Sequence, residues 1–226
     1  MNLPYRLKKI TELVPPSDTV ADIGCDHAYV AIELVKSGKA KHALACDVNE
    51  GPLKSAGQNV LSEGLTDKVE LRLSDGLARV KAHEADTVII AGMGGLLMER
   101  ILTGHLKDFD TFVLSPQSDI EHFRHFLIDN GMKIVSENML IDDKKYYTIL
   151  TVSANILSDS ESTNDYYKND EDFIYGGLLL KEKDETLLSF LQKEKLRYEN
   201  ILSKTQNDEL KKSYEICKRA IEKHYQ

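Results

Sequence analysis

The sequence predicts an α/β fold built on a doubly wound, mostly parallel sheet. Along most of the 226-residue chain, short apolar runs typical of strands alternate with runs of helical periodicity. One apolar run ends at a lone glycine, Gly24, followed by a short polar turn, as a strand does when it leads into a ligand-binding loop. The hydrophobic content of 42% is enough to fill such a core and to leave about seventy residues for an appendage.

A helix over residues 3–14 opens the chain, because its apolar residues recur at helical spacing until Pro15 and Pro16 end it. Strands and helices then alternate. The expected strands span residues 19–24, 42–48, 69–73, 86–91 and 111–114. The expected helices span residues 29–36, 50–63, 96–104 and 120–130, with only a short turn at 75–81.

Two further apolar runs, 133–140 and 146–153, follow each other with only the turn Asp142-Asp143-Lys144-Lys145 between them. A parallel pair would need a crossover helix, so these runs should form an antiparallel hairpin at the sheet edge. The hairpin completes a sheet of seven strands.

The composition changes after Ile156, which divides the chain into a domain of residues 1–156 and a second of residues 157–226. Residues 158–172 are polar and acidic, as in a linker or surface loop. Beyond them, residues 183–204 and 207–225 carry apolar side chains at spacings of three and four. These two runs predict an α-helical hairpin.

Charge and composition narrow the class of protein. The net charge of −8 argues against a strongly basic nucleic-acid binder, although residues 181–226 hold 11 basic against 9 acidic side chains. The three cysteines have no metal-ligand spacing, and Cys25 and Cys46 should be buried, reduced thiols. No long apolar run is present at the start or elsewhere, so we expect a cytoplasmic protein without a membrane partner and without a metal.

The loop after the first strand favours a cationic cofactor. A dinucleotide site would need the glycine pattern G-x-G-x-x-G, which places backbone amides against a pyrophosphate. This chain has Gly24 alone, flanked by Asp22 and Asp26. Carboxylates beside the ligand suit S-adenosylmethionine, which carries an ammonium and a sulfonium. A buried Asp22 is costly unless it is paired, and an ammonium would provide the partner.

Further candidates for the cofactor site follow the next strands. Asp47 ends the second strand, where a carboxylate can accept both ribose hydroxyls, although an acid here also suits NAD. Asn49 follows it in the same loop. Asp75 and Gly76 could accept the adenine amino group and make room for the ring, or could form a plain turn.

Three glycines follow the fourth strand in the run Gly92-Met93-Gly94-Gly95. At the carboxyl edge of the sheet they would let the backbone approach a cofactor at Gly92 and a flat substrate beyond it. A strained turn with close packing is the other interpretation. The run contains no acid, lysine or cysteine, so the group that is modified must already be a nucleophile.

The chain resembles the bacterial TrmK family of class I methyltransferases. The resemblance covers nearly the whole chain and is carried by the runs ADIGCDHAY at 21–29, CDVN at 46–49, SDGL at 74–77 and IIAGMGG at 89–95. It implies a seven-stranded Rossmann-like domain followed by a coiled-coil-like helical domain. It also implies that S-adenosylmethionine is used to methylate N1 of adenosine at position 22 of tRNA.

After the fifth strand the family pattern is Gln-Pro-Asn, whereas this chain reads Ser115-Pro116-Gln117. The resemblance therefore brings the substrate base near Pro116, with the amide shifted to Gln117. Tyr29 is a further candidate for a substrate contact, with core packing as its other interpretation.

Adenine N1 has an in-plane lone pair, so the reaction needs positioning rather than a strong base. The product base is cationic, and Asp26 is the first choice for stabilising the charge as it develops. His27 either orients Asp26, contacts the substrate or caps the helix that begins near Ala28.

The helical hairpin has two interpretations. Its basic residues could contact tRNA phosphates, or its alternating charges could form a solvated face and its leucines a self-contained core or a dimer seam. The sequence leaves the oligomeric state open, with a monomer slightly favoured. The functional alternatives are a class I methyltransferase acting on another RNA or on a small molecule, and a non-catalytic RNA-binding protein of the same fold.

Overall fold

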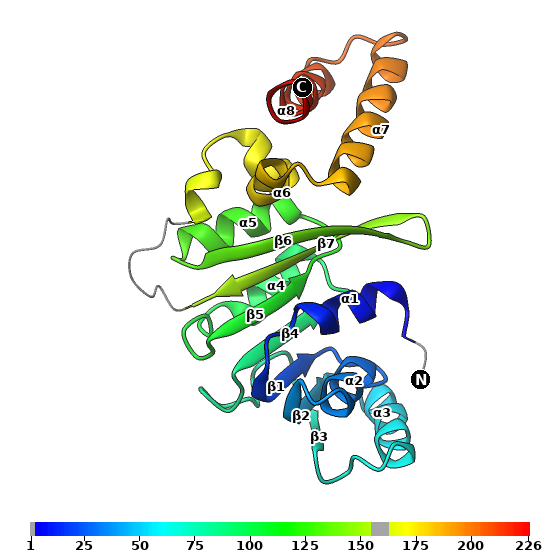
Figure 1. The fold of residues 1–226 in the computed structure, drawn as a ribbon, viewed down its shortest axis with the longest axis vertical. Coiled ribbons are helices and arrows are strands. Elements are labelled where there is room, and N and C mark those ends of the chain that lie inside the picture. Colours follow the sequence, from blue (N-terminus) through cyan, green and yellow to red (C-terminus); the bar gives the residue numbers. More distant parts are fainter. Residues whose placement is uncertain (1–2, 155–162) are drawn as a thin grey trace.

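The computed structural model describes residues 3–154 and 163–226 and contains a single seven-stranded sheet (Figure 1). Its spatial order is β3-β2-β1-β4-β5-β7-β6. The strands are β1 (Ser17–Ile23), β2 (Ala40–Asp47), β3 (Val69–Leu73), β4 (Thr87–Ala91), β5 (Thr111–Ser115), β6 (Lys133–Asp142) and β7 (Lys145–Ser153). Strand β7 is antiparallel to β5 and β6, whereas β1 to β5 pair in parallel. The predicted sheet, with its antiparallel edge hairpin, is confirmed.

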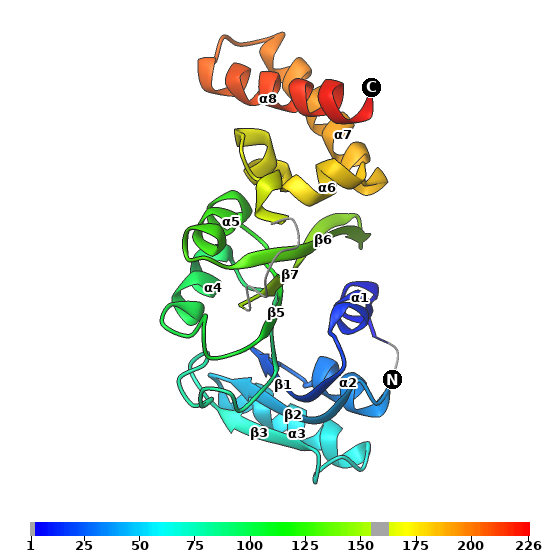
Figure 2. The same cartoon turned by 60° about the vertical axis from the view of Figure 1, so that its left-hand side comes forward.

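Helices cover both faces of the sheet (Figure 2). The helices α1 (Tyr5–Leu13), α2 (Tyr29–Lys36) and α3 (Glu50–Ser62) lie on one face, and α4 (Gly95–Leu102) and α5 (Ile120–Asp129) on the other. Alternation along the strands accounts for the two layers: in β1, Val20 packs into the α1–α3 core, while Ala21 and Ile23 pack into the α4–α5 core. Both cores are apolar because the sheet is buried on both sides.

The strand order changes direction between β1 and β4, and this point sets the place of the site. Ile23 of β1 lies beside Cys46 of β2 on one side and Ile90 of β4 on the other. The loops that leave these strands therefore converge at one edge of the sheet. In open α/β sheets, ligands bind in this crevice outside the carboxyl ends of the strands.

The C-terminal region contains three α-helices in the described residues: α6 (Gly177–Glu182), α7 (Glu185–Leu202) and α8 (Asp208–Tyr225). The bounds of α7 and α8 lie close to the predicted ones. The short α6 was not predicted, although Leu178, Leu179 and Leu180 are all buried there. In Figure 1, α7 runs along the long axis and α8 is seen nearly end-on, so the two helices cross steeply. A coiled coil is not shown.

The acidic segment 158–172 is only partly described, because the predicted boundary at 156 and residues 158–162 lie outside the described residues. Where the chain resumes, it forms a 3-10 turn at Thr163–Tyr166. Tyr167 then joins the α4–α5 core, and Glu171 and Asp172 are 2% and 5% exposed. The described part of this segment is therefore a partly buried connection rather than a loop that lies wholly on the surface, since its remaining residues are mostly exposed. The division of the chain into two domains stays a prediction.

A buried ion pair joins the sheet domain to the C-terminal helices. Arg124 of α5 donates to Glu137 of β6 at 2.7 Å, and both side chains are almost completely buried. The guanidinium also donates to the carbonyls of Phe173 and Ile174, and Glu137 accepts from the amide of Leu178. Every charge at this junction therefore has protein partners.

Among the described residues, no helix has the length and apolar character of a membrane span, and no cluster of His, Cys, Asp or Glu is arranged to hold a metal ion.

Candidate active site

Two adjoining cavities lie at the carboxyl edge of the sheet and share Gly24, Ala91 and Gly92 in their walls. The first cavity, of about 280 Å³, extends from Gly24 toward α1 and Gln117. The second, of about 290 Å³, extends toward the ends of β2 and β3. Each is close to the lower end of the range for small-molecule sites, about 300–1,000 Å³.

The loop after β1 is tightly folded against β2. Gly24 has a φ of +74°, and its amide donates to the carbonyl of Cys46 at 2.8 Å. Asp26 and Ala28 also adopt left-handed conformations, which are costly for residues other than glycine and concentrate at functional sites. Helix α2 then begins without a side-chain cap, so capping by His27 is excluded.

Asp22 brings a carboxyl group into the floor of the first cavity. The residue is 5% exposed, and its Oδ2 atom has no hydrogen-bond partner. Burial raises the pKa of this carboxyl to about 7, and the nearby Asp47 adds to the shift. A protein leaves a buried acceptor without a partner only at a cost, so the arrangement indicates a donor that comes from outside the chain.

Asp47 and Asn49 lie in the second cavity at the end of β2. The Asp47 carboxylate accepts the amide of Asn49 at 2.9 Å and the amide of Asp26 at 3.3 Å. These bonds fix the carboxylate while it still lines the cavity. The loop after β1 and the acid at the end of β2 are therefore held together by hydrogen bonds. A ligand that spans both cavities would contact both of them.

The third-strand candidates also lie in the second cavity. The Asp75 side chain is 71% exposed and forms an ion pair with Arg100 of α4 at 3.6 Å, a partner that the sequence did not indicate. Gly76 has a φ of +57°, and a side chain there would press on Ile101. Local packing is thus a sufficient reason for this glycine, and the role of Asp75 toward a ligand stays a prediction.

The outer wall of the first cavity is formed by Asp26, His27 and Tyr29. The Asp26 carboxylate is 70% exposed and lies 3.6 Å from His27 Nε2. The His27 and Tyr29 rings stack with their centroids 5.2 Å apart. Tyr29 is half-buried and lines the cavity, and its contact with a substrate stays a prediction.

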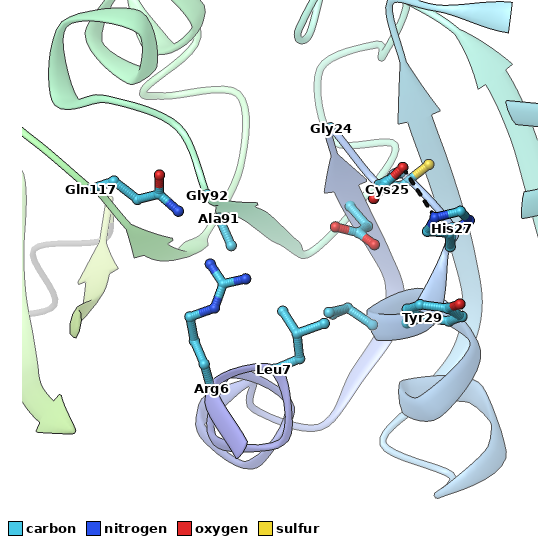
Figure 3. Close-up of a pocket in the computed structure, with 12 residues that line it drawn as sticks. Arg6, Leu7, Gly24, Cys25, His27, Tyr29, Ala91, Gly92 and Gln117 are labelled. Carbon is cyan, nitrogen blue, oxygen red and sulfur yellow. Dashed lines mark ion pairs between the residues drawn. The ribbon is translucent and has the colours of Figure 1, made fainter. Parts of the chain in front are cut away.

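Arg6 enters the same cavity from α1, opposite the loop after β1 (Figure 3). Its guanidinium lies near Gly92 and Gln117, and the Arg6 Nη1 atom is buried without a hydrogen-bond partner. The sequence pattern did not single out Arg6, which lies between the apolar residues of the first helix together with Lys8 and Lys9. The one sequence signal for Arg6 as a site residue is its position near the start of a helix that precedes the first strand.

The chain is similar to known proteins over most of its length. The model of the family described as tRNA (adenine(22)-N(1))-methyltransferase, TrmK, matches residues 20–226. A tRNA (adenine(22)-N(1))-methyltransferase of Bacillus subtilis is 33% identical over 191 residues, which are 83% of this chain and 79% of that protein. The chain belongs to the TrmK family.

Solved structures of TrmK proteins have the same fold. The Streptococcus pneumoniae protein Sp1610, solved with S-adenosyl-L-methionine, is 33% identical with a TM-score of 0.84, and the match covers 97% of this chain and all of that one. Mycoplasma capricolum TrmK, solved with S-adenosyl-homocysteine, is 27% identical with a TM-score of 0.85, over 98% of this chain and 99% of that one.

The glycine run after β4 divides into two parts in this TrmK family member. Gly92 has a φ of +83° and lines both cavities, and Met93 lines the second, where its methyl group lies over Gly24. Gly94 and Gly95 line neither cavity. A side chain on Gly94 would press on the Ser118 hydroxyl, and one on Gly95 on the backbone of the loop after β5. For these two glycines close packing is a sufficient explanation.

The loop after β5 is tied to the glycine run, because the amide of Gln117 donates to the Met93 carbonyl at 2.9 Å. Ser115 donates its hydroxyl to the Thr148 carbonyl, Pro116 is buried, and neither lines the two cavities. Gln117 is the member of this segment that faces the first cavity. The substrate roles of Gln117 and Pro116 both stay predictions, although only Gln117 lines the cavity.

Cys25 and Cys46 are buried and free, as predicted. Burial raises the pKa of both thiols. A thiol that stays protonated is a poor nucleophile, so Cys25 contributes packing to the cavity wall rather than chemistry.

Proposed function

We propose that this chain methylates N1 of adenosine at position 22 of tRNA, with S-adenosylmethionine as the methyl donor. The observation that supports the proposal most directly is the Oδ2 atom of the buried Asp22 carboxyl, which has no hydrogen-bond partner. Asp22 lines the first cavity with Gly24, and the adjoining second cavity holds the fixed carboxylate of Asp47. Because tRNA is the substrate, the reaction takes place in the cytoplasm.

The donor set fits the proposed cofactor. Asp22 offers an acceptor to an ammonium, and Asp47 offers two carboxylate oxygens at the place where ribose hydroxyls would lie. Gly24 and Gly92 keep the passage between the cavities free of their own side chains. When bound, S-adenosylmethionine supplies a methyl group that is already activated on a sulfonium.

The residues of the chain then have to position the base. Adenine N1 carries an in-plane lone pair and accepts a methyl group without first losing a proton, so alignment can supply most of the rate. Gln117 and Gly92 lie on the side of the first cavity that is next to the β5 loop, and the amide of Gln117 can both donate and accept. The target atom lies on the Watson–Crick edge, so the base has to leave its pairing partners before it enters.

Asp26 has the position of an electrostatic stabiliser for the cationic product. If it acts on charge that develops only during methyl transfer, Asp26→Asn should lower kcat at least tenfold and change the Kd for S-adenosylhomocysteine less than twofold. Asparagine tolerates the left-handed φ of 48° at this position, so the substitution isolates the charge. Turnover within twofold of the unchanged protein would remove Asp26 from the mechanism.

The function is tested by tritiated methyl transfer onto tRNA transcripts, with nucleoside analysis of the product. We expect 1-methyladenosine in a transcript with adenosine at position 22, and none in the matched transcript with guanosine there. Methylation of both transcripts would assign a different nucleoside, and methylation of neither would leave the family assignment without the proposed substrate.

A further inference from the structure

The tip of the β6–β7 hairpin lies between α1 and α7 (Figure 1, Figure 2). On one side, Asp142 accepts the amide of Arg6 at 3.2 Å, and the Tyr147 ring lies 4.9 Å from the guanidinium of that residue. On the other side, the Tyr146 ring meets the Phe190 ring of α7 edge-on, with the centroids 5.1 Å apart. Because Arg6 lines the first cavity, the tip joins the wall of this cavity to the C-terminal helices.

The turn at the tip carries two lysines past α1. Lys145 is the strand partner of Asp142, and Lys144 is one of the two residues of the turn itself. Both lysines are exposed, and in the part of the chain that the structure describes neither forms an ion pair. Directly paired residues of antiparallel strands have Cα atoms about 4.5–5.5 Å apart, so Lys145 lies close to the residue that holds Arg6.

The conformation of this turn is unfavourable for the residues that form it. Asp143 and Lys144 have φ values of +46° and +62°. A two-residue hairpin turn of this kind favours glycine at its second position, because glycine adopts a left-handed conformation without a steric cost. Here that position holds Lys144. Left-handed residues other than glycine concentrate at functional sites, and the lysine provides a charge that glycine would not.

Helix α7 adds a third exposed lysine to the same surface. Lys193 Nζ lies 5.5 Å from the centre of the Tyr146 ring, and the Tyr146 hydroxyl lies 3.3 Å from Ser189 Oγ. The ring is thus held between the hairpin and the helix, and it places the ammonium beside the tip. We call Lys144, Lys145 and Lys193 the tip lysines.

The charge of the rest of the chain distinguishes this surface. Residues 1–180 are acidic overall, because the net charge is −8 and residues 181–226 hold more basic than acidic side chains. The turn has one exposed acid, Asp143, against the three tip lysines. An acidic surface repels RNA, so the phosphates of an RNA substrate favour a local cluster of positive charge.

We infer that the tip lysines bind phosphates of the tRNA next to the nucleotide that enters the first cavity. The inference rests on the proposed function and names the surface that receives the backbone of its substrate. A base that leaves its pairing partners remains joined to its own phosphates, which stay at the mouth of the cavity. The hairpin that holds Arg6 borders this mouth. Phosphate contacts position an RNA without reading its sequence, so they act on tRNA binding rather than on methyl transfer.

The surface is tested with variants of the full chain. Lys144→Gly combined with Lys145→Gln removes two charges and gives the turn the residue that its conformation favours, so the melting temperature should not fall. We expect the KM for the transcript with adenosine at position 22 to rise about fivefold or more, with kcat changed less than about twofold. In filter binding, the slope of log Kd against log salt should fall by about one to two units, because each phosphate contact contributes about 0.7–0.9. Lys193→Gln should lower the slope about half as much.

The matched control is Lys54→Gln combined with Lys68→Gln, which removes two exposed charges at the other end of the molecule and should leave KM and slope unchanged. Unchanged tRNA binding in the Lys144 and Lys145 variant overturns the inference, and so does an equal effect in the control, since overall charge would then be sufficient. Weaker binding of S-adenosylhomocysteine by this variant would mean that the tip acts through Arg6, which also overturns it. If the unchanged protein methylates neither transcript but loses tRNA affinity with the tip lysines, the surface stands and the proposed reaction fails.

Discussion

The cavity and the junction with the C-terminal helices both bury charged side chains, but they treat these charges in opposite ways. At the junction, Arg124 and Glu137 bond to each other and to three backbone groups, so their charges are internally neutralised. In the cavity, Asp22 keeps an oxygen atom without a partner and Arg6 a nitrogen atom. Both regions bury charge, but the charged groups at the junction have protein partners and those in the cavity keep atoms without one; the buried atom without a partner beside the junction, the Tyr167 hydroxyl, is neutral.

The difference matters because a buried charge costs several kcal/mol unless something compensates it. At the junction, protein groups alone compensate the buried charges of Arg124 and Glu137. We therefore assign these two residues to the attachment of the C-terminal helices. In the cavity the compensation is incomplete, so a ligand has to complete it. Missing partners at buried charged groups are therefore better evidence for a binding site here than burial or charge alone.

The largest effect is expected at the junction. Arg124→Met would leave Glu137 buried without its cation, which should lower the free energy of unfolding by about 3–5 kcal/mol. The matched control is Arg197→Met, which removes a surface ion pair with Glu194 and should cost about 0.2–1 kcal/mol. Urea unfolding measures both. Equal losses in the two variants would mean that the junction is not a structural pair of the kind described.

The next effect concerns the second cavity. Asp47→Ala should weaken S-adenosylhomocysteine at least tenfold, because two charge-assisted hydrogen bonds of about 1.5–3 kcal/mol each are lost before compensation. Asp67→Ala, an exposed acid that lines neither cavity, serves as the control and should leave the affinity unchanged. If calorimetry gave the same Kd for the Asp47 variant, the second cavity would not hold the ribose.

A smaller and graded effect is expected from pH. The Asp22 carboxyl has a pKa of about 7 in the free protein, so it is mostly protonated at pH 6. An ammonium needs the ionised form, and binding must then release a proton. The affinity for S-adenosylhomocysteine should fall by about tenfold per pH unit below 7 and level off above it. Asp22→Asn should remove this dependence, and a dependence that survives the substitution would assign it to another group.

The strands and the loop after β1 could be predicted because their signals are local. Asp22, Gly24 and Asp47 could be identified as candidates because they stand at the ends of apolar runs. Arg6 could not be found in this way, since its contact with Asp142 spans 136 positions and its neighbours Lys8 and Lys9 suggest a solvated face.

The same limit explains the missed packing of the acidic segment. Glu171 appears in a run of polar residues, yet Arg219 and Lys223 of α8 pair with it and make its burial possible. Nothing near residue 171 reveals these partners. Gly94 and Gly95 show the opposite case, in which a local signal suggested a substrate site. A glycine run at the ligand-binding edge is also needed where two loops pack closely against each other, and such packing is sufficient to explain these two glycines.

The C-terminal helices provide the smallest predicted effect and a test of whether their charges serve RNA. Lys211 and Lys212 are exposed near the start of α8, far from the lining residues of both cavities. Charge reversal is preferable to deletion of residues 181–226, because Leu179 and Leu180 pack on the helices that deletion would remove.

We expect the double variant Lys211→Glu, Lys212→Glu to weaken tRNA binding a few-fold and to flatten its dependence on salt, because each phosphate contact contributes about one unit to the salt slope. Cofactor affinity should not change. Reversal of Lys54 and Lys68, exposed on and beside α3 at the other end of the molecule, is the charge-matched control. Equal salt slopes in the two variants would exclude specific phosphate contacts by α8. A change in sedimenting mass without a change in tRNA binding would instead identify this face as a dimer seam.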